Sequence, residues 1–250
     1  SIINWIALSA IGFHSLLMAD VPMNKSIKSS LNNVQSMMVD SYYNFISRDI
    51  DTYISNNGLM IDYHPRGDSS LRYKDVSAIF QGSVWAAGTV DGSIRAIVGD
   101  YTQDMGPGSY GSDATSDAFK IYYVHTGMFT DPANYDDFQN WPINQGAPFV
   151  DVNGNGIYEP LPAGDDYPHF IGDKVAFFVA NDGDPAYKFN FGTSPMNLEM
   201  QFLIYSFDQP VSDYLAQSLF YKVLVINKGT DQINDTYFGV FFDDDLGYAG

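Results

Sequence analysis

The chain has 250 residues, of which 45% are hydrophobic, so it can build the core of one large β domain or of two smaller ones. It carries 30 acidic and 12 basic residues, a formal net charge of −18, which opposes binding to nucleic acid and to anionic lipid surfaces. The absence of cysteine excludes disulfides and thiolate metal sites. The excess of carboxylates favours divalent cations as partners.

The first 19 residues, SIINWIALSAIGFHSLLMA, are uncharged and mostly apolar, and Asp20 follows them. Such a segment is typical of the hydrophobic part of a secretory signal, with a cleavage point near Ala19. The alternatives are an uncleaved membrane anchor, for which about 18 apolar residues suffice, and a buried helix. We expect residues 1–19 to be a partial, signal-peptide-like helix. Its removal would leave a secreted or cell-surface protein without stable membrane insertion.

The remaining chain divides into a lead-in and a β-rich region. Residues 20–55 form the lead-in, and apolar residues at mixed spacing over 34–54 are compatible with a short helix or with an extended run. Residues 56–250 form the β-rich region, which we expect to continue into a further C-terminal part. A long acidic stretch punctuated by proline and glycine, about 130–170, is expected to be an excursion from it.

The clearest hairpin signal lies within residues 77–101. Two apolar and aromatic runs are joined there by Asp91-Gly92, a dipeptide typical of two-residue hairpin turns. Further β-rich runs, separated by turn signals that include the stretch 181–184, cover 119–127, 174–182, 198–208, 219–229 and 235–245. Strands without alternating helices predict a mainly all-β fold, an antiparallel β-sandwich with long loops.

The segment DVNGNGIYEP at 151–160 resembles a calcium-binding loop in its spacing. Loops of the EF-hand type place oxygen ligands at positions 1, 3, 5, 7 and 9, with glycine at position 6 for a sharp turn. Counted from the first aspartate, the ligand positions hold Asp151, Asn153, Asn155, Ile157 through its carbonyl, and Glu159, and Gly156 occupies the turn. The glutamate expected at position 12 is replaced by Pro162, so we expect Asp165 and Asp166 to complete the shell.

The donor set of this loop selects the metal. Its side chains offer hard oxygen donors, which favours Ca²⁺ over zinc, and a flexible multidentate loop favours Ca²⁺ over magnesium. Pro148, Pro160 and Pro162 exclude the long flanking helices of a true EF-hand. The alternative is an Asn/Gly turn that binds nothing. With its partly neutral ligands, the site is expected to bind with a dissociation constant of about 10⁻⁴ to 10⁻³ M.

Other chemistry is less well supported by the sequence. Asp243, Asp244 and Asp245 are compatible with a second cation site or with a solvated turn, and the four histidines lack the spacing of a zinc site. Nucleophile-elbow, P-loop and dinucleotide-binding motifs do not occur, so no catalytic residue is predicted. A pair of glycosidase carboxylates stays open, because such a pair is defined in space and not in sequence.

Three aromatic residues lie near the acidic loop: Tyr135, Trp141 and Tyr158. Exposed rings of this kind stack on sugars, and the alternative is that they cover the edge of a core. The choice between these two roles bears directly on whether the region recognises a glycan.

Several blocks of the chain together, and in this order, resemble a known group of proteins. They are YISNNG (53–58), AIFQGSVWAAGTVDGSIR (78–95), NWPINQGAPFVDVNGNGIYEP (140–160), GDKVAFFVANDGD (172–184), FGTSPMNLEMQ (191–201) and FYKVLVINKGTDQINDTYFGVFFDDDLG (220–247). With these blocks, most of residues 50–250 resembles large secreted proteins of Bacteroidota and related bacteria, in which a C-terminal sorting domain is typically read by the type IX secretion system. The resemblance implies export by the Sec route and delivery outside the cell, and it implies no catalytic residues. The blocks do not include a sorting domain.

Together, these features favour a non-catalytic, calcium-stabilised β module of a secreted or cell-surface bacterial protein with an adhesive or scaffold role. Its expected partners are calcium and an extracellular glycan or surface polymer, and not nucleic acid. The alternative is a polysaccharide-active enzyme or a carbohydrate-binding accessory module.

Overall fold

The computed structural model describes residues 6–8, 41–190, 192–208 and 213–247. The rest of the predicted signal segment, and the lead-in up to residue 40, lie outside these residues. Ile6–Leu8 form strand β1, which pairs antiparallel with β14 (Leu219–Asn227), where the sequence predicted part of a signal helix. An apolar tripeptide beside an open strand edge gains ladder hydrogen bonds in the extended conformation.

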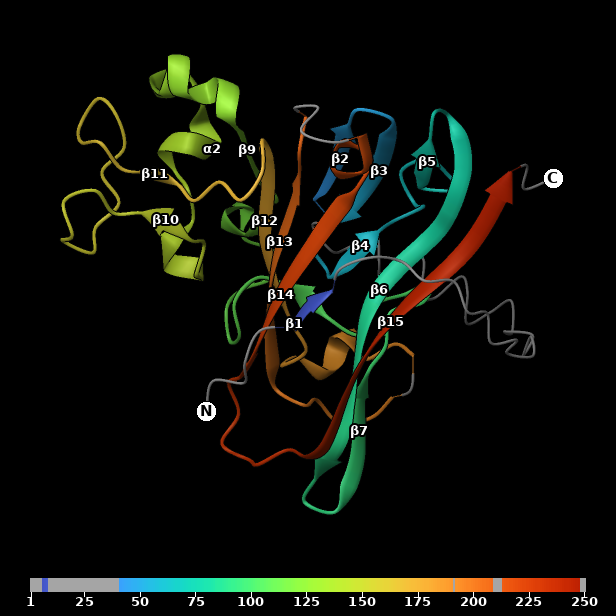
Figure 1. Ribbon diagram of the computed structural model, residues 1–250. Coiled ribbons are helices and arrows are strands. Elements are labelled where there is room, and N and C mark those ends of the chain that lie inside the picture. Colours follow the sequence, from blue (N-terminus) through green and yellow to red (C-terminus); the bar gives the residue numbers. More distant parts are fainter. Residues whose placement is uncertain (1–5, 9–40, 191, 209–212, 248–250) are drawn as a thin grey trace.

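The described residues form two large antiparallel sheets (Figure 1), which confirms the predicted all-β sandwich class. The first sheet has the order β1-β14-β13-β12-β8, with β9 also paired to β12. Its remaining strands are β8 (Gly106–Pro107), β9 (Tyr122–His125), β12 (Lys174–Asn181) and β13 (Leu198–Ser206).

The second sheet has the order β15-β6-β5-β3-β2, and β4 and β7 also pair with β6. Its strands are β2 (Tyr42–Ser47), β3 (Ile50–Ser55), β4 (Leu59–Ile61), β5 (Leu71–Tyr73), β6 (Val76–Val90), β7 (Ser93–Ile97) and β15 (Asn234–Gly247). The lead-in is therefore a β2–β3 hairpin from residue 42 onwards, so the extended alternative holds for this part and the helical one does not.

The predicted hairpin around Asp91-Gly92 is confirmed. Val90 of β6 pairs directly with Ser93 of β7, and Asp91 and Gly92 have φ angles of 49° and 75°. Both turn residues therefore lie in the left-handed region that a type I′ turn requires, and aspartate and glycine tolerate it. The signal at 181–184 does not form such a turn, because β12 ends at Asn181 and its partner β13 begins only at Leu198.

The main core lies between the two sheets. Phe178 of β12 and Phe202 of β13 are fully buried and stack with ring centroids 4.6 Å apart. They belong to one hydrophobic cluster with Phe45 and Ile54 of the second sheet and Val84 of β6. Burial of these large side chains between the sheets holds the sandwich together.

A second hydrophobic cluster covers the outer face of the first sheet. Phe177 and Val179 of β12 pack there against Phe138, Trp141 and their neighbours. Both faces of β12 are therefore buried, which explains why its sequence, KVAFFVAN, is continuously apolar instead of alternating.

The covering segment runs from residue 126 to 171 and projects to the left in Figure 1. Its elements are η2 (Thr126–Thr130), η3 (Pro132–Asn134), α2 (Asp136–Gln139), η4 (Ile143–Gln145), β10 (Phe149–Val150) and β11 (Tyr167–Pro168). Short helices elsewhere are η1 (Asp117–Phe119), η5 (Pro185–Tyr187) and α3 (Asp213–Ala216). No helix in the part of the chain that the structure describes is long and apolar enough to span a membrane.

Candidate metal centre

The predicted calcium loop is held at its base by a two-stranded ladder. Phe149 of β10 pairs with Pro168 of β11, and Val150 pairs with Tyr167. The chain between these strands projects from the covering segment, and residues 152–157 are all exposed. The ladder fixes both ends of the loop, so its internal geometry depends on the polar side chains that it carries.

Asp151 organises the first half of the loop. Its Oδ1 accepts hydrogen bonds from the backbone N–H groups of Gly154 (2.7 Å) and Asn155 (3.2 Å), and its Oδ2 accepts one from Gly156 (2.7 Å). Gly154 and Gly156 have φ angles of 75° and 77°, which glycine adopts without strain. The backbone therefore winds around the carboxylate of Asp151.

The two asparagines continue the same pattern. Asn153 Oδ1 accepts the N–H of Asn155 at 3.0 Å, and Asn155 Oδ1 accepts the N–H of Ile157 at 2.7 Å. Each amide oxygen has a second lone pair, which remains available to a cation. The Ile157 side chain is 60% exposed, which suits a residue that would contribute only its backbone carbonyl.

Glu159 closes the loop from the other end. Its Oε2 accepts hydrogen bonds from Asn155 Nδ2 (2.7 Å) and Asn153 Nδ2 (3.2 Å). Through these contacts, Asp151, Asn153, Asn155 and Glu159 are brought together, as the spacing of the sequence predicts. Both contacts are made by Oε2, and a carboxylate has about four acceptor sites on its two oxygens, so Glu159 can keep them and still coordinate a cation.

The two expected additional ligands differ in their surroundings. Asp165 is exposed, whereas Asp166 is only 2% exposed. Asp166 Oδ1 accepts the N–H of Val152 at 2.8 Å, and its Oδ2 accepts the N–H of Glu159 at 2.9 Å. Asp166 therefore ties the two ends of the loop together, a role that spacing alone does not indicate. Burial, together with the nearby charge of Asp166, raises the pKa of Tyr158.

We expect Asp166→Ala to lower the free energy of unfolding by about 2 kcal/mol, because it leaves two backbone N–H groups without their acceptor. Urea unfolding followed by tryptophan fluorescence measures this change. Asp165→Ala is the control, since it removes the same charge from the neighbouring exposed position. Equal effects of the two substitutions would contradict the role assigned to Asp166.

The carboxylates of the loop do not form a compact cluster. Among the described residues, no three or more His, Cys, Asp and Glu side chains are grouped so that they could hold a metal ion. A cation in this loop would therefore rely on amide and backbone oxygens beside the carboxylates of Asp151 and Glu159. Such a ligand set agrees with the weak affinity expected from the sequence.

The aromatic residues near the loop cover a core edge. Trp141 is only 3% exposed and donates its Nε1–H to the carbonyl of Pro148 at 2.9 Å. The hydroxyl of Tyr158 donates to the carbonyl of Phe138 at 2.6 Å, and Tyr135 is partly buried against the same cluster. Trp141 is therefore not available for stacking on a sugar, and the two tyrosines are partly buried.

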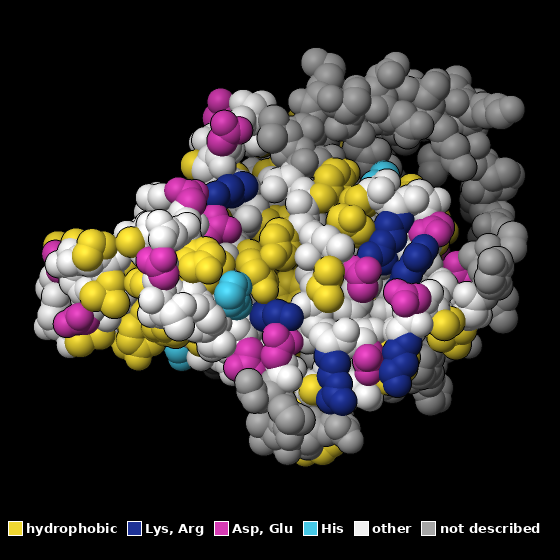
Figure 2. Space-filling model, turned by 90° about the horizontal axis from the view of Figure 1, so that it is seen from above, with side chains coloured by type: hydrophobic (Ala, Val, Ile, Leu, Met, Phe, Trp, Pro, Cys, Tyr) yellow, Lys and Arg dark blue, Asp and Glu magenta, His cyan; other side chains and the backbone are white. Residues whose placement is uncertain are grey.

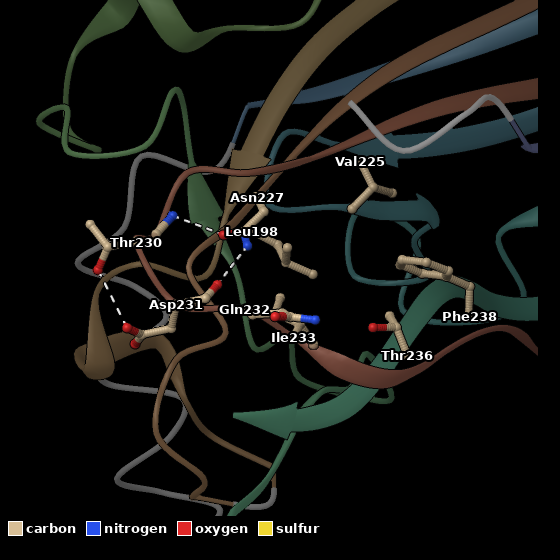
Figure 3. A pocket seen from close by; sticks show the side chains of 10 residues that line it. Leu198, Val225, Asn227, Thr230, Asp231, Gln232, Ile233, Thr236 and Phe238 are labelled. Atoms are coloured by element: carbon tan, nitrogen blue, oxygen red, sulfur yellow. Dashed lines mark hydrogen bonds between the residues drawn. The ribbon is translucent and has the colours of Figure 1, made fainter. Parts of the chain in front are cut away.

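A pocket of about 460 Å³ lies where β14 leads into β15 (Figure 3). Leu198, Val225 and Phe238 give it an apolar side. Asn227 Nδ2 donates to the carbonyl of Asp231 at 2.9 Å on the polar side. Asp231 is the one titratable residue among the described residues that line it, so the lining does not contain the carboxylate pair that glycoside hydrolysis uses.

Comparisons of the chain with family models, with curated proteins and with solved structures gave no match.

Proposed function

We propose that the chain is a non-catalytic β module whose loop at 151–166 binds Ca²⁺, and that it serves an adhesive or scaffold role in a secreted or cell-surface protein. The observation that carries this proposal is the arrangement of Asp151, Asn153, Asn155 and Glu159. Their oxygens share one glycine-kinked loop, and backbone N–H groups fix the orientation of the first three. Hard oxygen donors in a flexible loop suit Ca²⁺.

The expected affinity fits an extracellular setting. Calcium sites with dissociation constants of about 10⁻⁴ to 10⁻³ M are typical of extracellular modules. At 10 mM Ca²⁺, such a site would stabilise the folded chain by about 1.4 to 2.7 kcal/mol. The ion would also offset part of the net charge of −18, which otherwise disfavours the compact state. Export by a type IX route is supported by the resemblance of residues 50–250 to secreted Bacteroidota proteins.

The surface of the covering segment supports an adhesive role. Hydrophobic side chains lie over this projecting part at the left of Figure 2, with acidic side chains among them. Exposed apolar residues of the segment are Phe129, Val152, Ile157 and Leu161. Exposed apolar patches with polar surroundings are typical of contact surfaces for other macromolecules. Calcium would hold this surface in a fixed conformation.

Calcium titration tests the proposal. We expect the wild-type chain to release or absorb heat on addition of Ca²⁺ and to melt at a higher temperature in 10 mM Ca²⁺ than in chelator. Asp151→Ala should abolish the contribution of the loop to both, because Asp151 is the only side chain that accepts three backbone N–H groups within this loop. Asp91→Asn is the control: it removes one charge at an exposed turn, and asparagine tolerates the left-handed conformation there.

Two outcomes would count against this function. A calcium response that is the same in Asp151→Ala and in the wild type would remove the loop from the account. Binding on a glycan array, or release of reducing sugar from polysaccharides, would favour the carbohydrate-active alternative over a scaffold.

A further inference from the structure

Two of the three Asn-Gly pairs of the chain follow each other in the loop at 151–166. The pairs are Asn57-Gly58, Asn153-Gly154 and Asn155-Gly156. In such a pair the backbone nitrogen of the glycine can attack the side-chain carbonyl carbon of the asparagine, because glycine has no Cβ that hinders the approach. Asparagine is accordingly one of the chemically labile residues of proteins. Whether a given pair reacts depends on its exposure and on its local geometry.

The two pairs in the loop are open to the solvent. Residues 153–156 are all exposed. Beyond the adjoining residues, no described atom lies within 4 Å of the position that a Cβ would take at Gly154 or at Gly156. The nitrogen of each glycine can therefore be approached, and water can reach the site of reaction.

The hydrogen bonds of the two asparagines favour the attack. Asn153 Oδ1 accepts the N–H of Asn155, and Asn155 Oδ1 accepts the N–H of Ile157. A contact of this kind folds the asparagine side chain over the peptide that follows it, which carries the glycine nitrogen. It also polarises the side-chain carbonyl group, and the positioned donor stabilises the negative charge that the oxygen gains during the attack.

Asp151 holds the N–H groups of both glycines. Gly154 donates to its Oδ1 and Gly156 donates to its Oδ2, each at 2.7 Å. The N–H bond lies in the plane of the peptide, whereas the nitrogen attacks through the orbital perpendicular to that plane. Asp151 therefore orders the loop and leaves the attacking face of each nitrogen free.

Asn57 has the same following residue in a different environment. It is only 2% exposed, and its Oδ1 accepts the hydroxyl of Ser55 at 2.6 Å and the N–H of Leu59 at 3.4 Å. The terminal methyl group of Met105 packs against Gly58. Attack at Asn57 therefore requires local opening of the fold, and few molecules are open at any time.

We propose that Asn153 and Asn155 are sites of spontaneous deamidation in the folded chain, and that Asn57 is protected from it. A base from the solvent takes the proton of the Gly154 nitrogen, which bonds to Cγ of Asn153. The bond from Cγ to Nδ2 then breaks, and Nδ2 leaves as ammonia with a proton from water. The cyclic imide takes up one water molecule and opens at either carbonyl, to aspartate or to isoaspartate. Asn155 reacts with the nitrogen of Gly156 in the same way.

Deamidation changes the charge balance of the loop. Nδ2 of Asn155 and Nδ2 of Asn153 donate to Glu159 Oε2, at 2.7 and 3.2 Å. A carboxylate in either place would repel Glu159 instead, so closure of the loop would require a cation. Aspartate at both positions would raise the affinity for Ca²⁺, because affinity depends on the number of charged ligands. This consequence rests on the proposed function, whereas the deamidation itself does not.

Peptide mass spectrometry of the whole chain, kept folded for days in chelator and mildly alkaline buffer, tests the proposal. We expect the peptide with residues 153–156 to exchange amide for acid. Asn57 should convert at least about tenfold more slowly, because it reacts only from opened states of low population. In urea, where the fold is lost, Asn57 should convert at a rate close to that of the loop. An enzyme that methylates isoaspartate provides a second readout, which should label the loop peptide of the folded chain.

Asn153→Gln combined with Asn155→Gln is the matched variant. Glutamine keeps the amide, but its longer side chain closes a six-membered ring far more slowly, so conversion of the loop peptide should be lost. Both positions are exposed, and the variant should fold. Equal conversion of Asn57 and of the loop asparagines in the folded chain, or an unchanged loop peptide, would overturn the proposal. All of these measurements use chelator, so a loop that binds no calcium would leave their results unchanged.

Discussion

Asp182→Ala should lower the free energy of unfolding by about 3–5 kcal/mol, because it removes one partner of a buried ion pair. Asp182 is fully buried and accepts the backbone N–H groups of Met196 (2.7 Å) and Leu198 (2.8 Å). Its Oδ2 also lies 3.3 Å from Nζ of Lys188, whose side chain is 3% exposed. Without Asp182, the nearest remaining carboxylate of Lys188 is that of Asp104, at 4.0 Å.

Urea unfolding of the wild type and the variant measures this loss. Asp184→Ala is the matched control, since Asp184 is an exposed acid two residues away whose carboxylate accepts the N–H of Ala186. Asp182→Asn keeps an acceptor for one of the two backbone groups and should fall between the two. If the Asp182 and Asp184 variants unfold at the same urea concentration, the ion pair does not organise the connection between β12 and β13.

Phe178→Ala should also destabilise the chain by about 3–5 kcal/mol, through the loss of buried area and the cavity that remains. Phe178 is fully buried and stacks on Phe202, with an angle of 9° between the rings, so the surrounding sheets cannot close the gap without moving the strand ladder.

Thermal unfolding followed by circular dichroism measures this effect. Tyr237→Ala removes a ring of similar size from the outer strand β15, where the side chain is 71% exposed, and should change the melting temperature much less. A similar loss in both variants would show that the Phe178–Phe202 stack is not at the centre of the core.

The sequence predicted the strands well because turn and strand signals depend on residues that are neighbours in the chain. The turn at Asp91-Gly92 depends on the φ angles that its own residues tolerate, and the later β-rich runs became β9, β12, β13, β14 and β15. The continuous apolar run of β12 also contained the information that both of its faces are covered. The pairing of β15 with β6 was not predictable in this way, because it joins segments that are far apart in the chain.

The same distinction applies to the candidate sites. The spacing of Asp151, Asn153, Asn155 and Glu159 was sufficient to predict that they meet, because one glycine-kinked loop carries all four. The role of Asp166 was missed, since it depends on how β10 and β11 bring the ends of the loop together.

The central claim is that Ca²⁺ holds the loop at 151–166 in place, and limited proteolysis of the whole chain tests it most directly. An unspecific protease should cut within residues 151–166 first when a chelator is present, because an exposed loop without its ion opens readily. In 10 mM Ca²⁺, cleavage there should be strongly slowed, and in Asp151→Ala calcium should give no protection. Identical digestion of the wild-type loop with calcium and with chelator would contradict the claim.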